Sequence, residues 1–377
     1  MRYRMSVKTG ERISLLAFGA MRLPVINGVF SEIDEPKAIE MIRKAIDSGV
    51  NYIDTAYPYH NGNSEILVGK ALRDGYRGRV ILADKYPTWL TNASSNLSAI
   101  LSEQLNRLKV DSIDNYLIHS LNKPTWKLAR DHGIIPAVEK EREAGRVKYV
   151  GFSFHDALPL FKEIVDAYDW DFCQIQLNYA DENFQAGVEG LRYAAEKGIS
   201  VIVMEPLKGG KLTDSIPASI QRIWEESGTE LSPAEWAFRW VAAFPEVVTV
   251  LSGMSTMEQV EENIRIFSEM PDNPLTEEDR SLIKRVKDEY ERLIPYACTE
   301  CRYCLPCTVK LRIPHVIEDL NDWAMYKNPK SIESYKMWTP KEQYPSNCTK
   351  CGACEEKCPQ GLPIQRIMDE AAGIFER

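Results

Sequence analysis

Eight short apolar runs, rich in β-branched residues, alternate with amphipathic stretches along the first two thirds of the chain. Apolar runs of this length and composition are typical of buried strands. The runs are Leu15–Met21, Asn51–Ala56, Val80–Lys85, Ser112–His119, Tyr149–Phe154, Phe172–Leu177, Val201–Pro206 and Val247–Gly253. Helical periodicity lies between most of them, in stretches such as Pro36–Ser48, Ser64–Arg73, Ser94–Leu108, Gly187–Lys197 and Ser232–Ala243.

This alternation of strand and helix predicts a parallel sheet. Eight such units in about 300 residues favour a closed (β/α)8 TIM barrel. A doubly wound open sheet is disfavoured because no G-x-G-x-x-G follows the first apolar run. Helices predicted over Met257–Phe267 and Glu277–Leu293 would close the barrel. We therefore assign residues 1–290 to the barrel and residues 291–377, with a helical stretch near Ile317–Met325, to a small and mostly helical second domain.

Eight of the nine cysteines lie in two short runs of this second domain. The first run holds Cys298, Cys301, Cys304 and Cys307, and the second holds Cys348, Cys351, Cys354 and Cys358. With Pro359, the second run spells C-x₂-C-x₂-C-x₃-C-P, the bacterial ferredoxin pattern for iron–sulfur ligation. Disulfides are a rival interpretation that needs an oxidising compartment, and zinc is the stronger rival. The pattern predicts two [4Fe-4S] clusters in a ferredoxin-like domain.

In two-cluster ferredoxins, the fourth cysteine of each run binds the other cluster. Applied here, one centre would take Cys298, Cys301, Cys304 and Cys358, and the other would take Cys348, Cys351, Cys354 and Cys307. The first run is irregular, because only two residues separate Cys304 from Cys307 and Thr308 stands where proline is usual. If Cys307 does not reach, the second centre fails or becomes a three-iron cluster.

Composition excludes several classes of function. The formal net charge is -9 and the basic residues are not clustered, which argues against a nucleic-acid partner. A mean hydropathy of -0.33 and the lack of any long apolar run predict no membrane segment. The first residues show no apolar run of the secretory type, so a cytoplasmic protein is expected.

In a barrel of this kind, the carboxyl ends of the strands converge on the active site. Asp54, Lys85 and His119 stand at the ends of three predicted strands, and Tyr59 follows in a loop. Singly, each of these residues has an ordinary structural explanation, such as a strand-end cap. Together they suit carbonyl reduction, with Tyr59 as the proton donor. We expect Lys85 to lower the pKa of Tyr59, Asp54 to hold Lys85, and His119 to donate a hydrogen bond to the substrate oxygen.

The stretch from Asp54 to Tyr59, together with Lys85 and His119, resembles the aldo-keto reductase superfamily. The segments Gly151–Ser153, Gln174–Gln176 and Gly253–Ser255 with Asn263 carry the same resemblance, which runs from about Arg12 to Phe267. With the cysteine runs, the chain is similar to the iron–sulfur branch of that superfamily.

The resemblance implies a nicotinamide cofactor, NADP or NAD, bound without a Rossmann domain. Ser153 and Gln174 would contact its carboxamide. The remaining contacts implied in this way are Gly19, Met21, Met204, Pro206, Leu207, Gly209, Gly210, Gly253, Ser255, Gln259 and Asn263. Many members place an aromatic residue at the position of Met204, and asparagine after the serine that corresponds to Ser153. The Lys and Arg that grip the 2′-phosphate of NADP in many members align with Gly253 and Gln259, which leaves the choice between NADPH and NADH open.

These features favour an NAD(P)H-dependent oxidoreductase that reduces a small aldehyde or ketone, with clusters that are structural or pass electrons to a ferredoxin or another carrier. One alternative is a ferredoxin- or flavin-coupled enzyme that acts on a non-carbonyl substrate. Another is a redox-sensing subunit that binds nicotinamide with little turnover.

Overall fold

A computed structural model describes residues 1–91, 97–214, 216–298 and 301–377. The chain forms two compact units. The first comprises Met1–Gly209 and Leu231–Glu277, and the second comprises Gly210–Glu230 and Glu278–Arg377. Segment 210–230 therefore packs with the C-terminal region, while the expected boundary between residues 290 and 291 stays a prediction.

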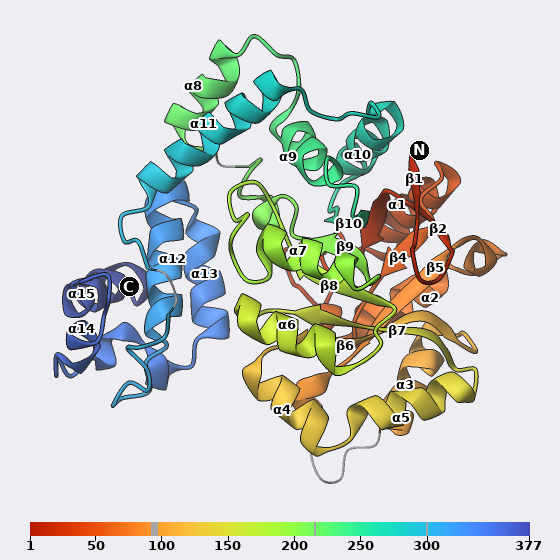
Figure 1. Ribbon diagram of the computed structural model, residues 1–377, viewed down its shortest axis with the longest axis horizontal. Coiled ribbons are helices and arrows are strands. Elements are labelled where there is room, and N and C mark those ends of the chain that lie inside the picture. Colours follow the sequence, from red (N-terminus) through yellow and green to blue (C-terminus); the bar gives the residue numbers. More distant parts are fainter. Residues whose placement is uncertain (92–96, 215, 299–300) are drawn as a thin grey trace. The chain divides into compact units, whose positions relative to one another are not determined.

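Eight parallel strands of the first unit close into a barrel in the order β10-β3-β4-β5-β6-β7-β8-β9 (Figure 1). The strands are β3 (Leu16–Gly19), β4 (Tyr52–Asp54), β5 (Ile81–Tyr86), β6 (Ile113–Leu121), β7 (Val147–Phe154), β8 (Phe172–Gln176), β9 (Ser200–Met204) and β10 (Val247–Gly253). The predicted TIM barrel is thus confirmed. A two-stranded antiparallel sheet, β1 (Tyr3–Met5) with β2 (Arg12–Ser14), was not predicted.

Helices follow the barrel strands along the chain, and all but the last of them lie between two successive strands. They are α1 (Glu35–Asp47), α2 (Asn63–Ala71), α3 (Leu97–Leu108), α4 (Lys123–Asp131), α5 (Ile134–Glu143), α6 (Leu158–Ala167), α7 (Gly187–Glu196), α9 (Pro233–Ala242) and α10 (Met257–Glu269). The helix expected from Ser94 is observed as α3 from Leu97, and residues 94–96 lie outside the described part of the chain. Side-chain caps begin several helices, as where Thr256 Oγ accepts a hydrogen bond from Gln259 N at 3.3 Å.

Buried side chains fill the barrel interior, because alternate residues of each strand point inward. Ala17, Tyr52, Ala83, Leu117 and Phe172 belong to one such apolar cluster. This packed interior supports the carboxyl ends of the strands, where the polar residues lie.

In the described residues of the second unit, all regular secondary structure is helical. Its helices are α8 (Ala218–Glu226), α11 (Glu277–Leu293), α12 (Ile313–Tyr326), α13 (Pro329–Trp338), α14 (Ala353–Glu356) and α15 (Ile364–Phe375). The predicted helical stretch near Ile317–Met325 lies within α12. Its apolar core, which includes Val316, Leu320, Ile367 and Phe375, packs against six of the cysteines. No helix of the described residues is long and apolar enough to cross a membrane.

Candidate active site

Four predicted side chains meet where neighbouring strands β4, β5 and β6 end. Asp54 is the last residue of β4, Lys85 lies near the end of β5 and His119 lies in β6, while Tyr59 begins a short 3-10 helix, η1 (Tyr59–Gly62). Lys85 Nζ donates hydrogen bonds to Asp54 Oδ1 at 2.5 Å and to Thr55 O at 2.8 Å, and it lies 3.5 Å from Tyr59 Oη. The structure therefore brings the Tyr59 phenol, the Lys85 ammonium group and its carboxylate partner together.

Lys85 remains an ammonium group although its side chain is fully buried. Burial by itself lowers the pKa of Lys85, but the charge of Asp54 and the nearby Tyr59 raise it above its usual value. The three donors of the ammonium group are directed at Asp54, Thr55 and Tyr59, so its orientation is fixed.

The pKa of Tyr59 is raised, which corrects the sign expected from the sequence. Burial of the phenol raises its pKa, and the positive charge of Lys85 offsets only part of that rise. The sequence indicates that Lys85 is a charged neighbour of Tyr59, but it does not reveal how deeply the phenol is buried. At neutral pH Tyr59 therefore carries its proton and is able to donate it.

His119 lies beside Tyr59 and Trp89. Its ring centre is 6.1 Å from that of Tyr59, in an edge-on arrangement, and 5.1 Å from that of Trp89. Burial, and then the charges of Lys85 and His155, hold the pKa of His119 well below its usual range. Its Nδ1 is buried without a hydrogen-bond partner among the described residues. A neutral imidazole with one free nitrogen is suited to donate a hydrogen bond from the other nitrogen.

Two of the predicted carboxamide contacts lie on the next strands around the barrel. Gln174 Nε2 in β8 donates to Asp54 Oδ2 at 3.2 Å, so this side chain adjoins the four residues described above. Ser153 Oγ in β7 accepts from the backbone N–H of Ser120 at 2.7 Å. Met204 ends β9, and Pro206 and Leu207 follow it at the same end of the barrel.

Apart from Gly210, which belongs to the second unit, the other predicted cofactor contacts lie at the ends of β3, β9 and β10, which are neighbours in the barrel. Gly19 pairs in register with Gly253, and Met21 is 47% exposed. Gly209 and Gly210 have φ values of 69° and 94°, which favour glycine. Near α10, Ser255 N donates to Gln259 Oε1 at 2.8 Å, and buried Asn263 donates to Ser252 Oγ at 3.0 Å.

Arg22 lies among these loops and was missed by the sequence analysis. A Cβ placed on Gly209 would come within 3.0 Å of Arg22 Nη2, and one placed on Gly253 would meet the aliphatic part of the same side chain. Among the described residues, the guanidinium of Arg22 has no carboxylate partner. The only sequence signal is a basic residue directly after the first barrel strand, which is too common to be informative alone.

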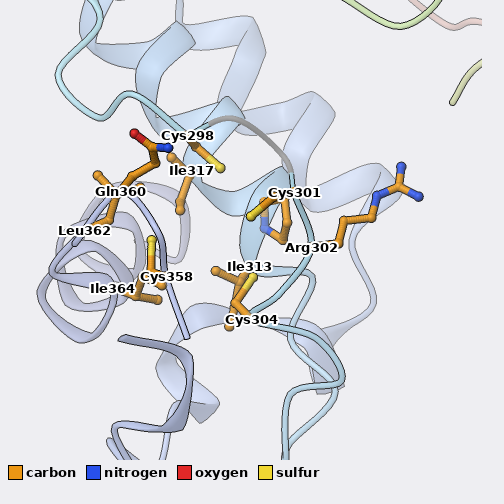
Figure 2. Close-up of a pocket in the computed structure, with 11 residues that line it drawn as sticks. Cys298, Cys301, Arg302, Cys304, Ile313, Ile317, Cys358, Gln360, Leu362 and Ile364 are labelled. Atoms are coloured by element: carbon orange, nitrogen blue, oxygen red, sulfur yellow. The ribbon is translucent and has the colours of Figure 1, made fainter. Parts of the chain in front are cut away.

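The second unit gathers the cysteines around two pockets. One is lined by Cys298, Cys301, Cys304 and Cys358, and Figure 2 shows their sulfur atoms turned toward a shared space while Arg302 points away. The other is lined by Cys304, Cys307, Cys348, Cys351 and Cys354. Each pocket thus contains one of the two cysteine sets expected from the sequence.

Each pocket is lined by four or more thiols, a donor set that suits a [4Fe-4S] cluster. In the described part of the chain, no three Cys, His, Asp or Glu side chains are close enough to bind one ion together. The ligands of one zinc ion all lie about 2.3 Å from it if they are thiolates. In a [4Fe-4S] cluster each thiolate binds a different iron, so the sulfur atoms lie farther apart.

Comparison with known proteins identifies both parts. Residues 15–288 match the Aldo/keto reductase family, and residues 295–362 match the 4Fe-4S dicluster domain. The chain belongs to the aldo/keto reductase family. It is an oxidoreductase of the NAD(P)H-dependent type that defines this family, and it carries a C-terminal 4Fe-4S dicluster domain with eight cysteines.

Relatives cover the barrel region at moderate identity. An L-galactose dehydrogenase of Arabidopsis thaliana is 27% identical, over 76% of this chain and 94% of its own length. The NADH-specific methylglyoxal reductase of Escherichia coli (strain K12) is 26% identical, over 71% and 92%. The holo form of aldo-keto reductase AKR11C1 from Bacillus halodurans has a TM-score of 0.64 at 27% identity, covering 76% of this chain and 96% of its own.

The lowered pKa of His119 predicts that kcat/KM does not fall on the acid side of its pH profile because of this residue. Because the pKa of His119 is held well below its ordinary value, the ring stays neutral as the pH falls from about 8 to about 6. Protonation of His119 should therefore cause no loss of kcat/KM in this range. The measurement is the pH dependence of carbonyl reduction by the natural chain and by His119→Gln, which keeps a donor but does not titrate. An acid limb near pH 6.5, present in the natural chain and absent from the variant, would contradict the prediction.

Proposed function

We propose that this chain reduces an aldehyde or ketone, with Tyr59 as the acid that protonates the carbonyl oxygen. The observation that carries the proposal is the position of Lys85 Nζ, hydrogen-bonded to Asp54 and 3.5 Å from Tyr59 Oη. A bound nicotinamide would supply the hydride. The names of two relatives, an L-galactose dehydrogenase and a methylglyoxal reductase, support a small carbonyl or hydroxyl compound as the substrate class.

Tyr59, Lys85 and His119 would each have a separate role in proton transfer. Tyr59 holds its proton at neutral pH because burial raises its pKa, and it releases the proton toward the alkoxide that forms on the substrate. Lys85 stabilises the phenolate left behind, since its ammonium charge lies beside that oxygen. Neutral His119 would donate a hydrogen bond to the same substrate oxygen and orient it.

We further propose that the cofactor lies across the ends of β7 to β10 and β3. Ser153 and Gln174 would contact the carboxamide, and the loops that contain Gly209, Gly253 and Ser255 would hold the phosphates. The guanidinium of Arg22 supplies a cation beside these loops. Gly253, which aligns with a lysine of many family members, has no side chain to supply one. The NADH-specific relative supports a nicotinamide but leaves open which one this chain prefers.

Replacing the acid tests the proposal. Tyr59→Phe removes the hydroxyl but keeps the ring, so kcat for carbonyl reduction should fall at least about a hundredfold. Nicotinamide binding, followed by the fluorescence of the reduced cofactor, should change little. Tyr57→Phe is the matched control, because the Tyr57 hydroxyl bonds Glu103 at 3.1 Å and not Lys85, and its effect should stay within about threefold. Full turnover by Tyr59→Phe would refute the assigned acid.

For the dicluster domain we propose the crossed set of ligands. Cys298, Cys301, Cys304 and Cys358 would bind one cluster, and Cys307, Cys348, Cys351 and Cys354 would bind the other. The two pockets support this set, since Cys358 lines the pocket of the first run and Cys307 that of the second. Cys304 lines both pockets, which is consistent with two neighbouring clusters.

Single cysteine variants distinguish crossed from uncrossed ligation. Cys358→Ala and Cys301→Ala should each lower the iron content from about eight to about four atoms per chain and leave the same cluster, with the same electron paramagnetic resonance spectrum after reduction. Cys351→Ala should leave the other cluster and a different spectrum. Cys173→Ala, in the buried strand β8, should keep all the iron. A Cys358→Ala spectrum that matches Cys351→Ala would instead support uncrossed runs.

We also propose that the clusters exchange electrons with a one-electron carrier of the ferredoxin type. Cys301 and Cys351 are exposed, so each cysteine set has one ligand at the surface, where a partner could approach. Nicotinamide releases two electrons together as a hydride, whereas a cluster accepts one electron.

Anaerobic reduction tests this proposal. NADPH or NADH alone should leave the visible absorbance of the clusters unchanged, because no one-electron step links hydride to cluster. A reduced ferredoxin should bleach the same absorbance. Bleaching by nicotinamide alone would show direct transfer and contradict the need for a carrier. The Tyr59→Phe variant is the control, since carbonyl reduction is removed there without a change to any cysteine.

A further inference from the structure

Two carboxyl groups lie buried behind the backbone of Lys85. Asp84 precedes Lys85 in β5, and Glu65 lies in α2; both residues have 0% exposure. Because successive residues of a strand point to opposite faces, Asp84 points away from the side chain of Lys85. Neither carboxyl group takes part in the proton transfer described above, so their burial needs another explanation.

Asp84 and Gln104 of α3 hold the backbone of Lys85 from both sides. Asp84 Oδ1 accepts the Lys85 N–H at 2.8 Å, and Gln104 Nε2 donates to the Lys85 carbonyl at 3.1 Å. Gln104 Nε2 also donates to Asp84 Oδ2 at 2.8 Å, which closes the arrangement. The position of the Lys85 main chain, and hence of its ammonium group, depends on these contacts.

The hydrogen-bond donors at this point are too few if both carboxyl groups are ionised. Tyr116 Oη donates to Gln104 Oε1 at 2.6 Å, which turns the NH₂ group of Gln104 toward the carboxyl groups. That NH₂ group has two hydrogens. Three oxygens accept from it, namely Asp84 Oδ2, Glu65 Oε1 at 3.2 Å and the Lys85 carbonyl. One further proton is needed to satisfy the set.

Among the described residues, the nearby cations pair with other carboxylates, which leaves the side chain of Asp84 without an ion-pair partner. Glu65 Oε2 accepts from Arg107 Nη1 at 2.7 Å, and Arg107 also pairs with Glu103. The ammonium group of Lys85 is directed toward Asp54. Among the described residues, Tyr116 of β6 also faces the pair. Burial, and then the charge of Glu65, raise the pKa of Asp84 well above its usual range.

We propose that Asp84 and Glu65 hold one proton between them, carried by Asp84 and donated to Glu65, and that this neutral acid positions Lys85. The inference rests on the proposed role of Lys85 in carbonyl reduction. With Asp84 neutral, the ammonium group of Lys85 has Asp54 as its single carboxylate partner among the described residues. An ionised Asp84 would place a second negative charge behind Lys85 and weaken the support that Lys85 gives to Tyr59. Asp84 is thus a positioning residue.

Infrared spectroscopy tests the protonation state without turnover. A buried protonated carboxyl group has a carbonyl band separate from that of a carboxylate. Burial raises the pKa of Asp319 to about 7, so the spectrum is taken at about pH 9, where Asp319 is ionised. The band should be present there in the cluster-loaded chain and should disappear in Asp84→Asn. Asp171→Asn is the matched control: Asp171 is also buried and accepts a backbone N–H, from Val150 at 2.9 Å, but it faces Arg142 at 3.4 Å. Absence of the band in the natural chain, or its persistence in Asp84→Asn, overturns the proposal.

Kinetics test the positioning role. Asp84→Ala leaves the Lys85 N–H without its acceptor, and kcat should fall about tenfold or more with little change in KM. Asp84→Asn should recover most of this loss, since an amide offers the same acceptor to Lys85 and an N–H to Glu65. Equal losses in the two variants would mean that a carboxylate is required, which overturns the proposal. If Tyr59→Phe keeps its turnover, the proposed function fails, but the infrared result stands independently.

Discussion

A fully buried ammonium group is the constraint on which the barrel site depends. An unpaired charge inside a protein is strongly unfavourable, so Lys85 requires a carboxylate at hydrogen-bond distance. Asp54 meets this need only because β4 and β5 are neighbours, with Asp54 in register with Ala83. Lys85 lies two residues beyond Ala83 and so points to the same face of the strand. The pairing of β4 with β5 is therefore what places the carboxylate beside the ammonium group.

The fold was predictable to a large extent because its signal is local. Runs such as Val247–Gly253 carry enough β-branched residues to be recognised as strands, and their alternation with helices leaves few topologies. The β1–β2 pair escaped prediction, since Tyr3–Met5 and Arg12–Ser14 are short and partly polar. Helix and strand ends differ from the expected ones by a few residues, as where β4 spans Tyr52–Asp54 within the expected Asn51–Ala56.

The positions of the candidate site residues could be predicted where those residues end strands. The pKa values that depend on burial could not be predicted from the sequence. Asp54, Lys85 and His119 could be found by position because parallel strands bring their carboxyl ends together. The sign of the Tyr59 pKa shift could not be found, because it depends on how fully the phenol is enclosed. Asp84 belongs to the apolar run Val80–Lys85, and its contact with Gln104 joins residues twenty positions apart. No local pattern reports such a contact.

The two units deal with charge in opposite ways, and this difference suits their chemistry. In the barrel, the charges of Lys85 and Asp54 are buried and paired with each other, away from solvent. In the dicluster domain, two clusters on eight thiolates would carry about four negative charges. There the exposed basic residues Arg302, Lys310, Lys350 and Lys357 accompany the cysteine runs, and one thiol of each set reaches the surface. In the proposed electron exchange, this exposure would let a carrier approach the clusters, whereas the proposed carbonyl reduction would gain from enclosure. Each of the two units has its own apolar core, so the enclosed site and the exposed cysteines are supported by separate packing.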